Sequence, residues 1–171
     1  MNDQPRIEQR DAISYVAIPL SVTLNDLSAA VERAFPELFA WLTSHSFEPA
    51  GPPFIRYVTV NMDTAMEIEL AAPVAGQLPA DERVQAGVLP AGRYLTLLHI
   101  GPYDQLVRAN GTLQDWAREH GLHWAMDEDS RWRGRIERYL TDPSRQPDSS
   151  QWQTEIAYLI DDQTPPTTEN P

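Results

Sequence analysis

Three side chains with acid–base or ligand-binding chemistry lie in two strand-like stretches near the C-terminus. Glu137 and Tyr139 belong to residues 133–140, and Glu155 lies within the largely apolar residues 152–160. A carboxylate inside an apolar strand costs several kcal/mol if it is buried without a partner. These glutamates therefore need a cation, a hydrogen-bond donor or water.

Two explanations fit these carboxylates. A cationic ligand would satisfy them, and neighbouring aromatic rings would add about 0.5–2 kcal/mol of cation–π attraction. Alternatively, Glu137 and Glu155 form ion pairs with nearby arginines and have only a structural role. The candidate partners are Arg133, Arg135 and Arg138. Spacing alone does not decide between the two explanations.

The alternation of side chains along a strand sorts these residues by face. Glu137 and Tyr139 share one side of their strand, and Glu155 lies on the side away from Ile156. If the apolar sides meet the helices, Glu137, Tyr139 and Glu155 line the opposite, open face of the sheet. By the same rule Tyr57 joins them there.

A repeated pattern indicates how the elements are organised. The pattern L-x-x-W-x-x-x-H occurs at residues 38–45 and again at 113–120. Its Leu, Trp and His positions share one face of a helix, and each copy lies between similar strand-like stretches. We therefore predict an α+β fold of tandem duplicated βαββ units with pseudo-twofold symmetry. Antiparallel sheets would carry helices on one face and a ligand cleft on the other.

The boundaries follow from the periodicity and from turn signals. We expect a flexible N-terminus at 1–10, a domain at 11–160 with repeats at about 11–75 and 90–160, and a disordered tail at 161–171. Asn25 or Asp26 is expected to cap the first helix, which kinks or restarts at Pro36. Gly121 is expected to end the second helix. The expected strands cover residues 12–20, 54–61, 66–74, 83–89, 93–100, 133–140 and 152–160, and the expected helices cover about 26–42 and 104–120.

Composition excludes several classes of function. The chain has 13 basic residues, all arginine, against 25 acidic ones, and its net charge of −12 is unfavourable for contacts with nucleic-acid phosphates. The absence of cysteine excludes disulfides, a thiolate nucleophile and cysteine-ligated zinc. No stretch approaches the length of a membrane span. We expect a cytoplasmic protein, either a monomer or a homodimer.

Other groups of polar residues are better explained by a structural role than by a metal-binding or catalytic one. His120 and His123, with the acidic residues 127–129, resemble a metal site, but they straddle a helix end and a solvated loop. His99 lies on an apolar strand, where a core histidine is commoner than a catalytic base. Glycine-rich phosphate loops and the G-x-S-x-G signature are missing. We therefore expect neither a metal nor a cofactor.

An ordered set of short motifs resembles the GyrI-like (gyrase-inhibitor-like) effector-binding domains, which also form the ligand-binding half of AraC-type and MerR-type regulators. Its central piece is G-R-Y-L-T-L-L-H-I-G-P-Y at 92–103, followed by a helix with Leu113 and Trp116. The other pieces occur in the family's order, over about residues 11–160. They are L-F-A-W-L at 38–42, G-P-P at 51–53, E-I-E at 67–69, E-R-Y-L at 137–140 and W-Q-T-E-I at 152–156.

The resemblance implies a tandem βαββ fold whose halves form a cleft for bulky, lipophilic and often cationic compounds. Glu155 matches the acidic residue of the family's T-E-[IL] strand, and Glu137 and Tyr139 match its E-x-Y strand. Some members are described as hydrolases of reactive cyclopropane-bearing compounds. The stretch 121–133 is longer and more charged than the family pattern. The resemblance leaves no room for a helix-turn-helix, so we expect no DNA-binding element.

Three functions follow as hypotheses. The first is a binding module for bulky lipophilic molecules, cationic or aromatic, in which Glu155 and Glu137 supply the counter-charge. Its aromatic walls would be Tyr15, Tyr57 and Tyr139. The second is a hydrolase in which Glu137 or Glu155 is the general base and Tyr139 donates a proton to the leaving atom. The third is a protein-interaction modulator, such as a gyrase-inhibitor-like protein.

Overall fold

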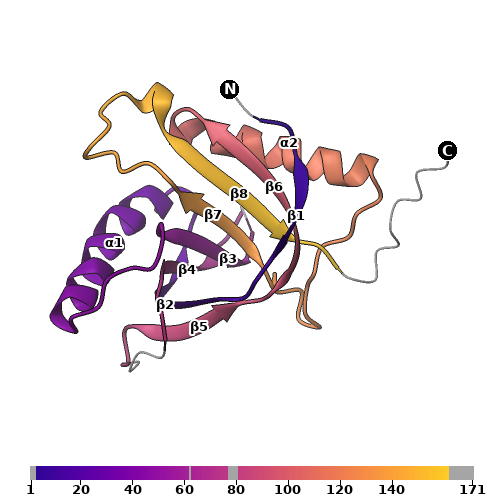
Figure 1. Cartoon of the computed structure of the whole chain (residues 1–171). Coiled ribbons are helices and arrows are strands. Elements are labelled where there is room, and N and C mark those ends of the chain that lie inside the picture. The colour runs from indigo at the N-terminus through magenta and orange to yellow at the C-terminus, as the bar shows by residue number, and fades with distance from the viewer. Residues whose placement is uncertain (1–2, 62, 77–80, 162–171) are drawn as a thin grey trace.

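The structure is a computed structural model that describes residues 3–61, 63–76 and 81–161. Within these residues the chain forms an α+β fold with the helices α1 (Leu27–Ser44) and α2 (Leu106–Glu119) (Figure 1). Short 3-10 turns, η1 (Tyr103–Gln105) and η2 (Ser149–Gln151), precede α2 and the last strand. The strands are β1 (Arg6–Arg10), β2 (Ile13–Val22), β3 (Phe54–Thr59), β4 (Met66–Pro73), β5 (Gln85–Leu89), β6 (Gly92–Ile100), β7 (Arg135–Tyr139) and β8 (Gln153–Leu159).

The described strands form one antiparallel sheet in the order β1-β6-β8-β7-β3-β4-β2-β5. Helix α1 packs mainly on β2 and β4, and α2 packs on β6. The helices thus lie toward opposite ends of the sheet, with the central pair β7–β3 between them (Figure 1). Neither helix combines the length and apolarity that a membrane span requires, and this holds for every helix in the described ranges.

Two short links join strands that lie far apart in the sheet. The pairs β1/β2 and β5/β6 are each six places apart in the strand order, yet only residues 11–12 and 90–91 connect them. In a flat sheet those strands would lie about 29 Å apart, whereas three Cα–Cα steps span at most about 11 Å. The sheet must therefore curl until its edges approach each other.

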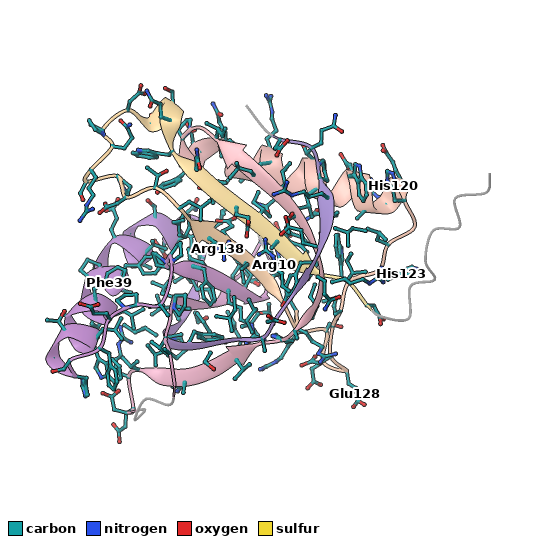
Figure 2. All side chains as sticks on the ribbon, in the orientation of Figure 1. Arg10, Phe39, His120, His123, Glu128 and Arg138 are labelled. Carbon is teal, nitrogen blue, oxygen red and sulfur yellow. The ribbon has the colours of Figure 1, made fainter. Side chains whose placement is uncertain are left out.

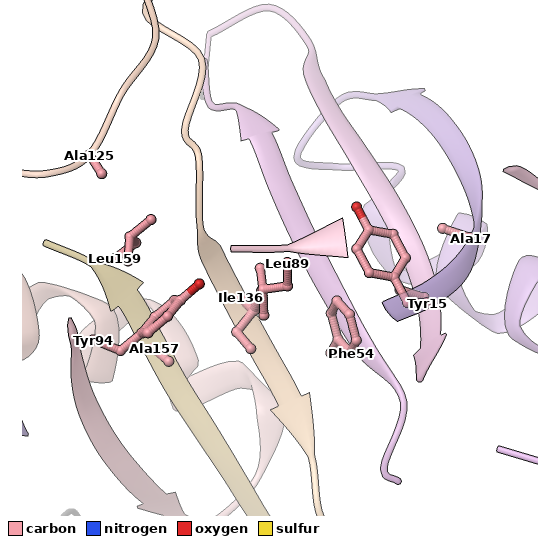
Figure 3. Close-up of a cluster of buried hydrophobic side chains, with 10 residues drawn as sticks. Tyr15, Ala17, Phe54, Leu89, Tyr94, Ala125, Ile136, Ala157 and Leu159 are labelled. Atoms are coloured by element: carbon pink, nitrogen blue, oxygen red, sulfur yellow. The ribbon is translucent and has the colours of Figure 1, made fainter. Parts of the chain in front are cut away.

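The curl turns the concave side of the sheet into a core of its own (Figure 3). Tyr15 of β2 and Tyr94 of β6 belong to one buried cluster there, although their strands are five places apart in the sheet. Tyr15 meets Phe54 edge-on, with ring centroids 5.3 Å apart. The convex side is covered by the helices, through the buried Leu38 and Leu42 of α1 and Leu113 of α2. Both faces of this sheet are thus buried over much of their area.

The elements confirm most of the expected order. Every expected strand is present, and α1 continues through Pro36, so it does not restart there. Asp26 does precede α1, but it makes no capping hydrogen bond, because its carboxylate accepts from the Thr23 hydroxyl at 3.0 Å instead. Gly121 follows α2 with a φ of +67°, as expected for a helix stop.

One expected boundary is wrong. We expect residues 1–10 to be flexible, but Arg6–Arg10 form β1, and every residue of β1 pairs with β6. The alternating polar residues of this strand look like an exposed lead-in because it lies at the sheet edge. Of the expected disordered tail, residues 162–171 lie outside the described residues.

The repeated Trp–His pattern ends both helices in the same way. His45 and His120 are the C-cap residues, and each stacks on the tryptophan four residues before it, at 4.1 Å and 3.7 Å between ring centroids. In each case the histidine Nδ1 lies 2.8 Å from the carbonyl oxygen of that same tryptophan. The repeated pattern is therefore a helix stop rather than a ligand site.

The close approach of β5 to Tyr15 can be tested with two glycine variants. A Cβ at Gly87 would lie 2.5 Å from Cζ of Tyr15, whereas a Cβ at Gly111 in α2 meets nothing within 4 Å. We expect Gly87→Ala to lower the free energy of unfolding by about 1–3 kcal/mol. We expect Gly111→Ala to raise it by up to about 1 kcal/mol. Urea denaturation measures both, and equal effects would contradict the described packing of β5.

Candidate functional site

The strand register places Glu137 at the centre of the helix-covered face. Directly paired residues of antiparallel strands point to the same side of a sheet. Glu137 pairs with Ile55 on one side and Ile156 on the other, and this row continues across the sheet. The row, from β2 to β6, is Ile18, Leu70, Ile55, Glu137, Ile156 and Leu97. Glu137 is its one polar member.

Neutral groups hold the Glu137 carboxylate. Its side chain is only 8% exposed. Asn110 of α2 donates to Oε1 at 3.1 Å, and the Tyr139 hydroxyl donates to Oε2 at 2.9 Å. Among the residues that the structure describes, no arginine or histidine lies within ion-pair distance of this carboxylate. Glu137 is thus a buried negative charge with hydrogen-bond donors but no paired cation.

Aromatic rings surround this carboxylate and join the two helical units. The Tyr139 ring meets Phe35 of α1 edge-on at 6.2 Å, and it meets Tyr103 of η1 at 5.5 Å. Tyr57 and Tyr139 both belong to the buried cluster under α1. We call Phe35, Tyr57, Tyr103, Glu137 and Tyr139 the interhelical cluster.

Burial keeps the phenols of this cluster protonated. Burial raises the pKa of Tyr139 well above that of a free phenol, and the negative charge of Glu137 raises the pKa further. The pKa of Tyr57 is raised in the same way, by burial first and by Glu137 second. Both hydroxyls therefore remain hydrogen-bond donors at neutral pH.

The sequence analysis missed Phe35 and Tyr103 of this cluster, and it missed Asn110, which hydrogen-bonds to Glu137. Its amide donates to Glu137, while its carbonyl oxygen accepts from the Tyr158 hydroxyl at 2.6 Å. Gln114, one turn further along α2, donates to the same hydroxyl at 3.2 Å. The available signal was an amide side chain within the apolar stripe that includes Leu106 and Leu113.

The expectation that Glu137, Tyr139 and Glu155 share the open face, away from the helices, is wrong. Glu137 and Tyr139 lie on the helix-covered face, as does Tyr57, whereas Glu155 does lie on the opposite, concave face. Its Oε1 accepts from Arg10 at 2.7 Å and from Arg138 at 3.2 Å. Figure 2 shows Arg10 and Arg138 together over this part of the sheet. The parity argument failed because Ile136, taken to face a helix, belongs to the concave core. Glu155 therefore forms ion pairs of the kind that the alternative explanation expected, with Arg138 among the expected partners.

Tyr15 also lies on the concave face, apart from Tyr57 and Tyr139. Its hydroxyl donates to Glu69 at 2.8 Å and accepts from Arg56 at 2.6 Å. Burial raises the Tyr15 pKa, and the charge of Glu69 contributes to the rise. The five predicted ligand residues thus divide between two faces: Tyr57, Glu137 and Tyr139 on one, Tyr15 and Glu155 on the other.

A cavity of about 450 Å³ opens beside the concave core. Its lining includes Ser14, Gly51, Pro52, Pro73 and Arg138, and no aromatic side chain is among its lining residues. Without aromatic walls this cavity does not suit a bulky aromatic ligand, and its arginine is already paired with Glu155. We therefore place the candidate site at the interhelical cluster.

The contacts of His99 and His120 are those of structural histidines. His99 is buried, with Nε2 lying 3.2 Å from the carbonyl oxygen of Pro102. His120 is held against Trp116, as described above. In the parts of the chain that the structure describes, no three His, Asp or Glu side chains are grouped to hold a metal ion.

The curled sheet, its two helices and a buried polar group among aromatic rings define a small-molecule-binding class of domain. The chain belongs to the GyrI-like family, because the model of the GyrI-like small molecule binding domain matches residues 3–160. No curated protein matches the chain.

Solved structures of three other proteins share the fold. The chain is similar to EcmrR in a cryo-EM structure of an EcmrR–DNA complex, with a TM-score of 0.79 and 20% identity. That match covers 92% of this chain but only 57% of that chain. It is also similar to SAV2435 bound to tetraphenylphosphonium, with a TM-score of 0.68, 14% identity, and 94% and 95% coverage. A hydrolase from Listeria innocua matches with a TM-score of 0.62, 12% identity and 92% coverage of each chain.

The burial of the phenols predicts an unusual alkaline titration. All six tyrosines have a raised pKa, to about 12 for Tyr94, and burial is the first cause in each case. Since the folded pKa is the higher one, this contribution to stability is complete below about pH 10 and is lost as the pH rises through the folded values. Phenolate absorbance should therefore rise only together with the loss of the circular dichroism signal. Ionisation near pH 10 in the folded protein would contradict this burial; guanidinium-unfolded protein is the reference.

Proposed function

We propose that the protein binds bulky, lipophilic, aromatic small molecules at the interhelical cluster, with Glu137 as the polar anchor. The observation that carries this proposal is the position of Glu137, a buried carboxylate in an apolar row that only neutral groups hold. A ligand with a donor or a positive charge would satisfy it better. Membership in a small-molecule-binding family supports the proposal, as does tetraphenylphosphonium bound to the similar SAV2435.

Ligand entry requires the aromatic rings to separate. Tyr139 contacts Phe35 on one side and Tyr103 on the other, so a ligand above Glu137 replaces these contacts with its own. Phe35 also stacks on the partly exposed Phe39 at 6.1 Å, which provides an apolar approach along α1. The free energy of binding is then the difference between the contacts that the ligand makes and the ring contacts that are lost. This difference favours large aromatic ligands.

We also infer that this binding occurs without a DNA-binding element, since the net charge of −12 opposes phosphate contacts. The two halves of the fold are proposed to be duplicates. Each half adds one strand, β1 or β5, in front of a βαββ unit. Exchanging β1–β4 for β5–β8 leaves the strand order unchanged when it is read from the other end. The shared Trp–His helix stop supports the same proposal.

The test compares two glutamates on opposite faces of the sheet. A panel of neutral and cationic triaryl compounds is screened by thermal shift, and the best binder is measured by calorimetry. Glu137→Gln should weaken its binding by about tenfold or more, because a charged acceptor is lost. Glu155→Gln should leave the affinity unchanged and lower the free energy of unfolding by about 1–3 kcal/mol.

The opposite result would contradict the proposal. If Glu155→Gln lost the ligand while Glu137→Gln kept it, the site would lie on the concave face. If no compound stabilised the wild-type protein, small-molecule binding itself would lose its support.

A hydrolase is the second candidate, favoured by the 2.9 Å contact between Tyr139 and Glu137. Glu137 would take a proton from water, and Tyr139 would protonate the leaving atom of a strained-ring electrophile. The pKa of Tyr139 is raised, which makes it a weak acid for this role. Mass spectrometry should then find the water adduct with wild-type protein and none with Tyr139→Phe. Recovery of every electrophile unchanged would count against this candidate.

A further inference from the structure

A second buried charge lies beside Glu137 on the same face of the sheet. Arg135 precedes Glu137 by two residues on β7, so both side chains point toward the helices. It pairs in register with Tyr158, and its side chain is only 8% exposed. The site therefore contains a fixed positive charge as well as a fixed negative one.

Three aromatic rings enclose the Arg135 guanidinium. Its central carbon lies 4.7 Å from the ring centroid of Trp132, 4.7 Å from that of Tyr158 and 5.6 Å from that of Tyr57. These distances are within the range of cation–π attraction. Arg135 thus occupies the kind of aromatic cage in which a lipophilic cation would bind.

Arg135 differs from the half-buried Arg56 and Arg138 in lacking an ion pair. Arg56 and Arg138 pair with Glu69 and Glu155 through their terminal nitrogens, whereas Arg135 has no such carboxylate within the described residues. Its Nε is also buried without a hydrogen-bond partner, as are those of Arg56 and Arg138. Arg135 is therefore a buried cation with an unused N–H donor and no paired carboxylate.

The segment before β7 builds one wall of the cage. Trp132 is held in place because its backbone N–H donates to the carbonyl oxygen of Val58 at 2.8 Å, and it forms a bridge with Met126. The stretch 121–133, expected to be longer and more charged than the family pattern, therefore supplies a ring to the arginine cage.

We propose that Arg135 sets the ligand class of the site, which is neutral or zwitterionic aromatic molecules with a hydrogen-bond acceptor, in preference to permanent cations. This inference rests on the proposed function. A permanent cation would have to displace Arg135 or lie beside a like charge in a dry environment, which is unfavourable. An acceptor would instead receive a charge-assisted hydrogen bond from the unused Nε–H.

Two phenyl-substituted phosphorus compounds, one with four phenyl groups and one with three, separate these alternatives. Tetraphenylphosphonium is a permanent cation without an acceptor, and triphenylphosphine oxide is neutral with a strong acceptor oxygen. We expect the wild-type protein to bind the oxide at least about tenfold more tightly. Arg135→Met should reverse this order, because it removes the charge and the donor but keeps an apolar side chain. Arg108→Met, at an exposed position in α2, changes the net charge equally and should leave the order unchanged.

A second variant keeps the test decisive if Arg135→Met does not fold. Arg135→Lys retains the charge but loses the planar donor group, so it should still reject the phosphonium and should bind the oxide more weakly. Tighter binding of the phosphonium by the wild-type protein would overturn the inference and leave the proposed function standing. An unchanged order in Arg135→Met, or an unchanged affinity for the oxide in Arg135→Lys, would also overturn it. If neither probe bound any variant, the result would count against the proposed function and this inference together.

Discussion

The constraint on which the rest of the structure depends is the shortness of two links. Residues 11–12 and 90–91 each join strands that are six places apart, and the sheet must curl to allow this. The curl brings all the described strands except β1 into a shared concave core, where Tyr15 and Tyr94 belong to one cluster. It also carries β1 across to β6, so that Arg10 reaches Glu155 at 2.7 Å. A different linker length would alter all of these features.

Charged side chains have different kinds of partner on the two faces of the sheet. On the concave face, Glu155 accepts from two arginines, and Glu69 is shared by Arg56 and Tyr15, so the carboxylates have partners. On the helix-covered face, Glu137 has only neutral donors, and Arg135, two residues before it on β7, is held by aromatic rings. Breaking a buried ion pair costs several kcal/mol. A ligand at the helix-covered face, where we propose that it binds, would not have to break such a pair.

The sequence was sufficient for the elements but not for their faces. Hydrophobic periodicity located every described strand except β1, and alternation correctly placed Glu137 and Tyr139 on one side of β7. It failed between strands, because an apolar residue marks the buried side only when the other side faces water. Here both sides are buried, so Ile136 gave no information on which side meets the helices. Arg10 and Asn110 were missed for a related reason, since each becomes important only through a partner distant in the chain.

The order of the charges along β7 makes the two ends of the candidate site chemically different. Arg135 and Glu137 are two residues apart, which corresponds to about 6.6 Å along a strand. Trp132 and Tyr158 enclose the arginine end, whereas Tyr139, with Phe35 and Tyr103 around it, encloses the carboxylate end. A ligand whose acceptor and donor are separated by a similar distance would engage both charges at once, lying parallel to β7. Under the proposed function such a ligand would still separate the rings around Tyr139, but it would meet both charges at once. We therefore expect it to bind more favourably than one that must neutralise a single charge.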